Sequence, residues 1–176
     1  MMKPVFLKKL LAVAAGTLMM VALVLPGALC QETGAGEAGH RNQQGLEYYK
    51  KGFYEHAPKH QAVEAERNYQ LAVKEFKAAI ARDASSAEAH RNLARVYYVQ
   101  KNYDGAVEEY RTVTELAPSD LDAYVNLALA FIELKQPDAA IQALEQAKGQ
   151  TSDPQALETL DSYLAKVRAY QGKEAR

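Results

Sequence analysis

The chain has 176 residues, with 21 Lys or Arg against 22 Asp or Glu, so its formal net charge at pH 7 is −1. A chain this close to neutrality has no overall electrostatic attraction to nucleic acid, and we expect no nucleic-acid partner. Hydrophobic residues make up 48% of the chain and charged residues 24%, a globular composition that argues against wholesale disorder. The single cysteine excludes an intrachain disulfide and a multi-cysteine zinc site.

The first thirty residues have the features of an export signal. Three lysines precede an apolar run over residues 10–25, and the small residues Ala28 and Cys30 fit cleavage after Cys30. Two alternatives stay open. In the first, Cys30 is the lipidated cysteine of a bacterial lipoprotein, although the residue before it, Leu29, is larger than such a site usually has. In the second, residues 1–30 are not cleaved and remain as a membrane anchor. All three predict an exported chain, periplasmic or extracellular, that touches a membrane only through residues 1–30, if these are uncleaved or lipidated.

Residues 31–44 are rich in Gly and Gln and poor in apolar groups, which predicts a flexible linker. Beyond this linker the chain repeats itself. Residues 87–120 and 121–154 match at a shift of 34, which is typical of a repeat array. The identical pairs are Ala89/Ala123, Asn92/Asn126, Leu93/Leu127, Ala94/Ala128, Lys101/Lys135, Asp104/Asp138 and Ala106/Ala140.

Each block predicts two helices separated by a short polar turn. Apolar residues recur at helical spacing before and after Lys101-Asn102, and Pro118 ends the second helix of its block. Ser85 with Glu88 fits a capping box at the start of the first helix, and Ser119 with Asp122 is a weaker version of the same box. Helices that cross closely need small residues at the crossing, which accounts for Ala94 and Ala106.

This pattern resembles the tetratricopeptide repeat (TPR) family. The signature positions are His90, Leu93, Ala94, Tyr97, Ala106, Tyr110 and Pro118 in one block, and Tyr124, Leu127, Ala128, Phe131, Ala140 and Leu144 in the next. The resemblance, taken with the leader, is to an exported bacterial TPR protein. It implies an all-α, right-handed solenoid of about three helix-turn-helix repeats with a C-terminal capping helix. The expected segments are a degenerate first repeat over 45–86, repeats over 87–120 and 121–153, and the capping helix over 154–172.

The first repeat is only half in register. Asn68-Tyr69 lies 34 residues before Asn102-Tyr103, so the second helix of this repeat is clear. Leu46, Tyr49 and Phe53 would form the inner face of its first helix, but they come about ten residues too early. Residues 56–67 therefore read as an insertion, after which the following helix begins early and runs long.

In the TPR family the first helix of each repeat lines a concave groove that binds a partner protein or peptide. The residues expected to line it here are Arg91, Asn92, Arg95, Tyr98, Asp122, Val125, Asn126, Leu129 and Ile132. Arg91 and Arg95 lie four residues apart on one helix face, and Arg grips carboxylates well. We hypothesise a mixed groove that binds an acidic residue or a chain terminus beside an apolar side chain. The alternative is that both arginines pair with Glu88 and neighbouring acids on a solvated face.

The sequence predicts no enzyme, no cofactor and no metal site. His56 and His60 have a spacing seen in some zinc ligands, but Pro58 lies between them and no third ligand is evident. His90 occupies a signature packing position, where the family usually has Trp. Two functions remain: an exported adaptor or scaffold that binds a partner segment in its groove, and a structural subunit of a cell-envelope complex held by its ends or convex face. The sequence does not specify the oligomeric state.

Overall fold

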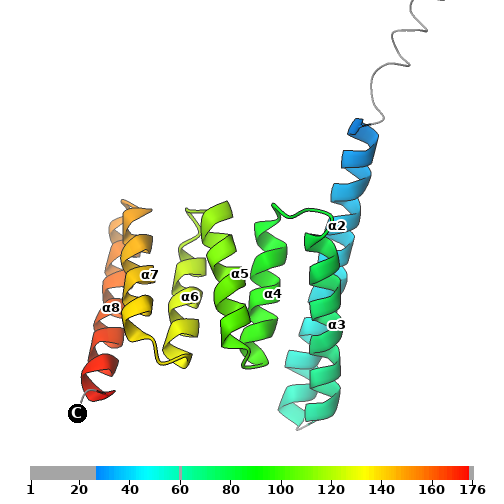
Figure 1. Cartoon of the computed structure of the whole chain (residues 1–176). Coiled ribbons are helices and arrows are strands. Elements are labelled where there is room, and N and C mark those ends of the chain that lie inside the picture. Colours follow the sequence, from blue (N-terminus) through cyan, green and yellow to red (C-terminus); the bar gives the residue numbers. More distant parts are fainter. Residues whose placement is uncertain (1–26, 60, 175–176) are drawn as a thin grey trace, which may run out of the picture. The chain divides into compact units, whose positions relative to one another are not determined.

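The computed structural model of the chain describes residues 27–59 and 61–174 (Figure 1). These residues form seven α-helices and no strand, which confirms the all-α prediction. The elements are α2 (Gly27–Lys50), a π-helix (Lys51–His56), a 3-10 helix (Ala57–Lys59), α3 (Ala62–Ile80), α4 (Ala87–Val99), α5 (Tyr103–Leu116), α6 (Leu121–Glu133), α7 (Pro137–Gly149) and α8 (Pro154–Glu174). Residues 37–176 make up one compact unit, separate from residues 1–36.

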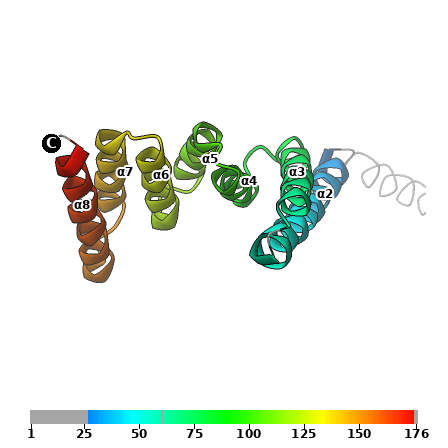
Figure 2. The ribbon, with the colours of Figure 1, turned by 90° about the horizontal axis from the view of Figure 1, so that it is seen from below.

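Within the unit formed by residues 37–176, each helix packs mainly on its neighbours in the chain. The pairs α4–α5 and α6–α7 are the helical hairpins of the two regular repeats, and α5 joins them by packing on α6. Figure 2 shows α3 to α8 following one another in chain order along a row. Such nearest-neighbour packing defines a solenoid, in which every repeat is stabilised by the repeats beside it.

The repeat signature accounts for the core. Leu93, Tyr110, Leu127 and Leu144 are each at most 4% exposed. The small signature residues, of which Ala106 is fully buried, let neighbouring helices approach closely. These side chains form one cluster around α5, α6, α7 and α8 and a second cluster around α3 and α4. Each Å² of apolar surface removed from water contributes about 25 cal/mol to stability, so both clusters stabilise the array.

The predicted flexible linker over residues 31–44 is instead helical, because α2 runs from Gly27 to Lys50. Its Ala38, Asn42 and Gly45 are buried. A Cβ on Gly45 would lie 2.6 Å from the ring of Phe76, so only glycine allows α2 to approach α3 this closely. The glycines inside the predicted linker, Gly34, Gly36 and Gly39, have open space around them, so the close crossing depends on Gly45 alone.

The insertion lengthens the first repeat at one end. The π-helix and the 3-10 helix follow α2, and α3 then begins at Ala62, so the prediction of an early and long helix is confirmed. Tyr49 stacks on Phe53 with ring centroids 5.7 Å apart, and Tyr49 also lies 6.3 Å from the ring of Tyr69. Tyr49 therefore helps to pack the atypical first helix pair, while Tyr54 is 68% exposed.

Two equivalent turns connect the helices of the regular repeats. Lys101 and Lys135 adopt the left-handed conformation, with φ of 59° and 58°. Around Lys101 the N–H of Lys101 donates to the carbonyl of Tyr98, and that of Asn102 donates to Tyr97, which is a Schellman motif. Asn102 then caps α5 by accepting a hydrogen bond from the N–H of Gly105 at 3.2 Å. The turn therefore ends one helix and begins the next within two residues.

The helix caps of α4 and α6 lie one residue later than predicted. Ser86, and not Ser85, caps α4, and Asp120, and not Ser119, caps α6. Ser85 instead donates its hydroxyl to Asp83 at 2.6 Å. Two consecutive residues able to cap a helix precede each start, and the sequence alone does not distinguish them.

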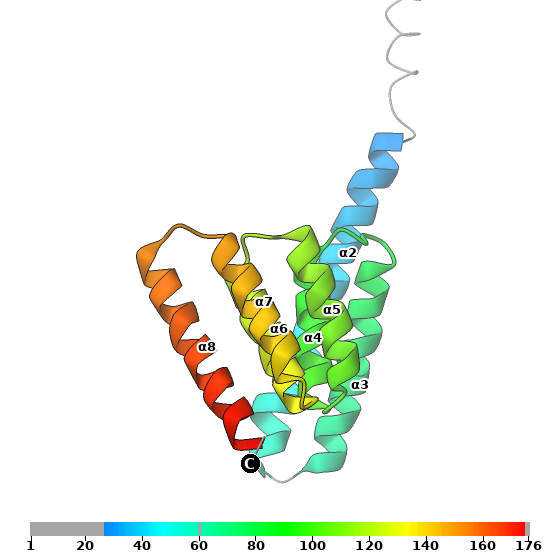
Figure 3. The same ribbon diagram turned by 60° about the vertical axis from the view of Figure 1, so that its left-hand side comes forward.

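The last helix, α8, covers the end of the array and packs on α7 (Figure 3). Its Leu160 and Leu164 are at most 2% exposed. Ion pairs from Lys148 to Asp161 at 2.6 Å and from Arg168 to Glu145 at 2.9 Å join the two helices at their surface. A terminal helix of this kind presents a polar face to water, as an array end requires.

The predicted export signal falls on residues 1–30, of which residues 1–26 lie outside the described residues. None of the described helices combines the length and the apolar character needed to cross a bilayer.

Candidate peptide-binding surface

Three of the predicted groove residues lie on one face of α4, which faces the neighbouring first helix, α6. Arg91 forms an ion pair with Asp120 at the start of α6, and the negative charge of Glu133 at the end of α6 acts on Tyr98. Between them, at helical spacing from both Arg91 and Tyr98, lies Arg95. We call this face of α4 and α6 the α4–α6 surface and define it by Arg95, Tyr98, Asp122, Val125, Asn126, Leu129 and Ile132.

Arg91 is a bridging residue and not a free ligand. Its side chain is 28% exposed, and that of Asp120 is 17% exposed. The Nε atom of Arg91 is buried and has no hydrogen-bond partner among the described residues. Asp120 is also the N-cap of α6, so the pair joins the start of that helix to α4. The predicted pairing with Glu88 does not occur, since Glu88 accepts a hydrogen bond from Asn42 at 2.9 Å.

Arg95 is exposed, and none of the described acidic residues forms an ion pair with it. Burial raises the pKa of Tyr110 to about 12, and the positive charge of Arg95 acts in the opposite direction. Burial also raises the pKa of Tyr49, which the same charge partly offsets. Arg95 therefore lies close to tyrosines from α2 and α5, beside Tyr98 of its own helix, with its guanidinium unpaired.

The two equivalent asparagines of the predicted groove differ in their surroundings. Asn92 is 5% exposed and donates from Nδ2 to Oδ1 of Asn42 at 3.0 Å, so it is part of the packing between α2 and α4. The prediction that Asn92 lines the groove is therefore wrong. Asn126 is half-buried, and no described residue hydrogen-bonds to its side chain.

The α6 side of the surface is apolar. Leu129 is 43% exposed, while Val125 and Ile132 are half-buried and pack against the core. Asp122 and Val125 also line a pocket of about 330 Å³ together with Thr159 and Tyr163 of α8. These α8 residues were not among the predicted groove residues, because the last helix was expected only to cap the array. The position of Tyr163 next to the apolar Leu164 is the feature of the sequence that could have indicated them.

Glu133 is a further residue outside the predicted groove set. Its negative charge acts on both Tyr98 and Tyr103, whose rings meet edge to face with centroids 5.4 Å apart. Burial, followed by the negative charge of Glu133, raises the pKa of Tyr98. Glu133 therefore lies near two phenols, and none of the described residues forms an ion pair with Arg95.

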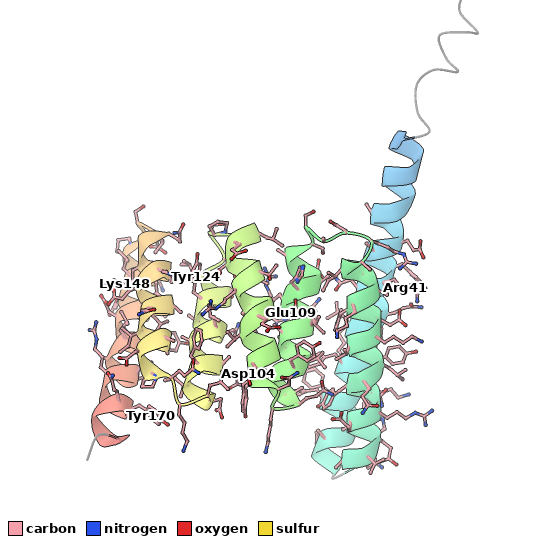
Figure 4. All side chains as sticks on the ribbon, viewed as in Figure 1. Arg41, Asp104, Glu109, Tyr124, Lys148 and Tyr170 are labelled. Carbon is pink, nitrogen blue, oxygen red and sulfur yellow. The ribbon has the colours of Figure 1, made fainter. Side chains whose placement is uncertain are left out.

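A second hollow of about 440 Å³ lies between α5, α6 and α7. Tyr124, Leu127 and Phe131 line it (Tyr124 is labelled in Figure 4), and the guanidinium of Arg111 lies 5.5 Å from the centre of the Phe131 ring. Unlike the α4–α6 surface, it is bordered by both second helices of the regular repeats. It lies outside the predicted groove.

The histidines fit packing roles where they are described. His90 is 9% exposed and hydrogen-bonds through Nδ1 to Glu109 at 2.6 Å and through Nε2 to the carbonyl of Ala84 at 3.2 Å (Glu109 is labelled in Figure 4). His56 contacts Gln61, and His60 lies outside the described residues. No group of three His, Cys, Asp or Glu side chains within the described part of the chain could hold a metal ion.

Two tetratricopeptide repeat family models match the chain, one over residues 61–120 and one over residues 99–169. Together they span residues 61–169, more than half of the chain. The chain belongs to the tetratricopeptide repeat family. No curated protein matches this TPR chain.

Solved TPR domains share the fold. The TPR2B domain of yeast Sti1, in a complex with pHsp70, is 20% identical with a TM-score of 0.60, over 76% of this chain and 98% of that one. The Arabidopsis OM64 TPR domain is 14% identical with a TM-score of 0.57, over 76% and 98%. The first TPR of Spaghetti (RPAP3), bound to the HSP90 peptide SRMEEVD, is 17% identical with a TM-score of 0.51, over 74% and 98%. At these identities the likeness shows the fold alone.

Proposed function

We propose that this TPR protein is a non-catalytic adaptor or scaffold that binds a segment of a partner protein on the α4–α6 surface. One observation carries the proposal: the unpaired guanidinium of Arg95 and the 43% exposed Leu129 lie on consecutive first helices of the solenoid. A single exposed leucine is ordinary, but an exposed leucine and an unpaired cation on one surface offer both apolar contact and charge to a partner.

The comparisons support a protein or peptide partner. The yeast Sti1 domain was solved in a complex with pHsp70 and the RPAP3 domain with an HSP90 peptide, so this fold holds peptide segments in those proteins. Their partners are not proposed for this chain. The residues that would hold a ligand here are those of the α4–α6 surface, with the pocket beside α8 as its continuation.

We place this adaptor outside the cytoplasm, in the periplasm or the extracellular space, on the strength of the leader pattern in residues 1–30. Retention as a lipoprotein through Cys30 or as an N-terminally anchored protein gives the same location for the repeat array. Mass spectrometry of the protein purified from cells distinguishes these cases: a mature chain that begins at Gln31 indicates cleavage, and a diacylglyceryl mass on Cys30 indicates lipidation.

Binding on the α4–α6 surface can be tested with two matched substitutions in the full-length protein. Leu129 is 43% exposed on α6, and Leu116 is 40% exposed at the end of α5, outside this surface. We expect in-cell crosslinking and capture to lose the partner in Leu129→Glu and to keep it in Leu116→Glu, with the same melting temperature in both. A partner that both variants keep contradicts binding on this surface.

The second candidate is a structural subunit held by the hollow between α5, α6 and α7. The observation in its favour is the hollow of about 440 Å³, which aromatic Tyr124 and Phe131 line together with polar Thr114 and Gln142. Thr114→Arg would fill it without altering the α4–α6 surface. Loss of the captured partner in Thr114→Arg, together with its retention in Leu129→Glu, favours the structural subunit.

A further inference from the structure

A cation lies over an aromatic ring at equivalent places in two successive repeats. The ammonium of Lys77 is 5.8 Å from the centre of the Tyr97 ring, and 34 residues later the guanidinium of Arg111 is 5.5 Å from the centre of the Phe131 ring. Each pair joins the second helix of one repeat to the first helix of the next. The junction of α3 with α4 and that of α5 with α6 can therefore be compared residue by residue.

A carboxylate completes this arrangement in the earlier repeat. Oε2 of Glu109, on α5, lies 2.6 Å from Nδ1 of His90 on α4 (Glu109 is labelled in Figure 4). Tyr97 first, and then the negative charge of Glu109, raise the pKa of Lys77 on α3, so the carboxylate also lies near that cation. Glu109 is therefore close to a polar group on each of the two helices that precede α5.

The later repeat keeps counterparts of both polar groups and lacks the carboxylate. The residues that follow His90, Lys77 and Glu109 by 34 positions are, in that order, Tyr124, Arg111 and Ala143. All three of these counterparts line the hollow of about 440 Å³ between α5, α6 and α7. Because the side chain of an alanine ends at Cβ, the later repeat has no carboxylate of its own at the position of Glu109.

The two polar counterparts are available to a ligand. Tyr124 is 5% exposed, and none of the described residues hydrogen-bonds to its hydroxyl. Arg111 is exposed, and no described acid forms an ion pair with it. Glu115 also lines the hollow, but it follows Ala81 by 34 positions and so does not replace Glu109. The Phe131 ring shields one side of the guanidinium from water, which strengthens a pair made there relative to one on an open surface.

We propose that the hollow between α5, α6 and α7 binds one carboxylate group, held by Arg111 and Tyr124 at the place that the Glu109 carboxylate occupies one repeat earlier. A guanidinium pairs with a carboxylate through two hydrogen bonds, and a phenol donates a third. The ligand carries its carboxylate on a short hydrocarbon stem, because that is what a Glu side chain has and Ala143 lacks. A free small acid and an acidic side chain of a partner both offer such a group.

This inference goes beyond the proposed function, because the hollow lies between the second helices α5 and α7 and uses no residue of the α4–α6 surface. The capture comparison of Leu129→Glu with Leu116→Glu judges binding on that surface separately. Failure of one proposal therefore leaves the other standing.

The test titrates probes into the full-length protein and follows two-dimensional NMR spectra. Propionate is the small-acid probe, and propionamide is its uncharged control. A blocked tripeptide with one central Glu represents a partner side chain, and the same peptide with Gln is its control. Arg111→Gln removes the cation, and Ala143→Glu supplies the hollow with a carboxylate of its own. Lys77→Gln is the matched control, because Glu109 already stands beside that cation.

We expect propionate or the Glu peptide to shift the amide signals around Ala143 saturably and to bind about tenfold more tightly than its uncharged control. Arg111→Gln and Ala143→Glu should each weaken this binding about tenfold, and Lys77→Gln should leave it unchanged. Tighter binding of propionate supports a free small acid as the ligand, and tighter binding of the Glu peptide supports a partner side chain.

Three results overturn the inference: equal binding of the charged and uncharged probes, undiminished binding to Arg111→Gln, or no saturable shift with any probe. An equal loss of binding in Lys77→Gln overturns it as well, because it would place the carboxylate outside this hollow. Should Ala143→Glu fail to fold, the comparison of Arg111→Gln with Lys77→Gln still decides.

Discussion

The hydrogen bond between Asn42 and Asn92 predicts that α2 is part of the folded array and contributes to its stability. Asn92, 5% exposed, donates from Nδ2 to Oδ1 of Asn42, which is 8% exposed, at 3.0 Å. This contact joins α2, the helix that replaces the predicted linker, to α4 across 50 positions in the sequence. Asn92→Ala removes the donor and leaves the buried oxygen of Asn42 without its partner.

The expected cost follows from two contributions. A neutral hydrogen bond contributes about 1 kcal/mol to stability, and an acceptor left buried without a donor adds a desolvation penalty, for a total of about 1–3 kcal/mol. For a folded unit that extends from Glu37 to Arg176, each kcal/mol corresponds to about 3–4 °C in melting temperature. Asn92→Ala should therefore lower the melting temperature by roughly 3–12 °C.

The repeat itself supplies the control. Asn126 stands 34 residues after Asn92, at the equivalent place in the next repeat, and no described residue hydrogen-bonds to its side chain. Asn126→Ala should change stability by no more than about 0.5 kcal/mol. Urea unfolding followed by far-UV circular dichroism compares the two variants. Equal unfolding of both variants would refute the reasoning, because it would mean that α2 adds nothing at the position of Asn42.

Three further predictions concern stability. Gly45→Ala should destabilise the array by about 1–3 kcal/mol, because its Cβ would meet the buried ring of Phe76 at 2.6 Å. In the same helix Gly39→Ala, with nothing within 4 Å, should stabilise it by about 1 kcal/mol, and urea unfolding measures both. Gln136 makes no side-chain cap at the start of α7, so Gln136→Asn should raise the melting temperature by an amount equivalent to about 1 kcal/mol. Burial raises the pKa of Tyr110 from 10.0 to about 12, so as pH rises the Tyr110 phenol ionises in the unfolded chain before it ionises in the folded one. The free energy of unfolding should therefore fall between pH 10 and 12, by up to about 2–3 kcal/mol more in the wild type than in Tyr110→Phe.

The regular repeats could be predicted from sequence because two copies carry the same signature at the same spacing. Leu93 and Leu127 occupy equivalent positions, and both are buried. The role of each position could therefore be checked against the equivalent position of the other repeat. The agreement includes Lys101 and Lys135, which both adopt the left-handed conformation. The first repeat had no such confirmation, since the insertion displaces its first helix out of register.

The candidate surface was predicted less well, because spacing along a helix gives the direction of a side chain but not its partner. Arg91 and Arg95 share one face, yet Arg91 pairs with Asp120 and Arg95 pairs with none of the described residues. Asn92 and Asn126 share a repeat position, yet only Asn92 hydrogen-bonds to a described residue, Asn42 of α2. These differences depend on which helix lies opposite, and that is a property of the tertiary packing.

Site-specific photocrosslinking in intact cells tests the central claim most directly. A photoreactive amino acid replaces Leu129 on the α4–α6 surface or Leu116 at the end of α5, two positions of matched exposure at 43% and 40%. Binding of a partner segment on this surface predicts an adduct to one protein from position 129 and none from position 116, with the crosslinked peptide mapping to one continuous segment. An adduct from position 116 and none from position 129 would contradict it and place the contact elsewhere on the array.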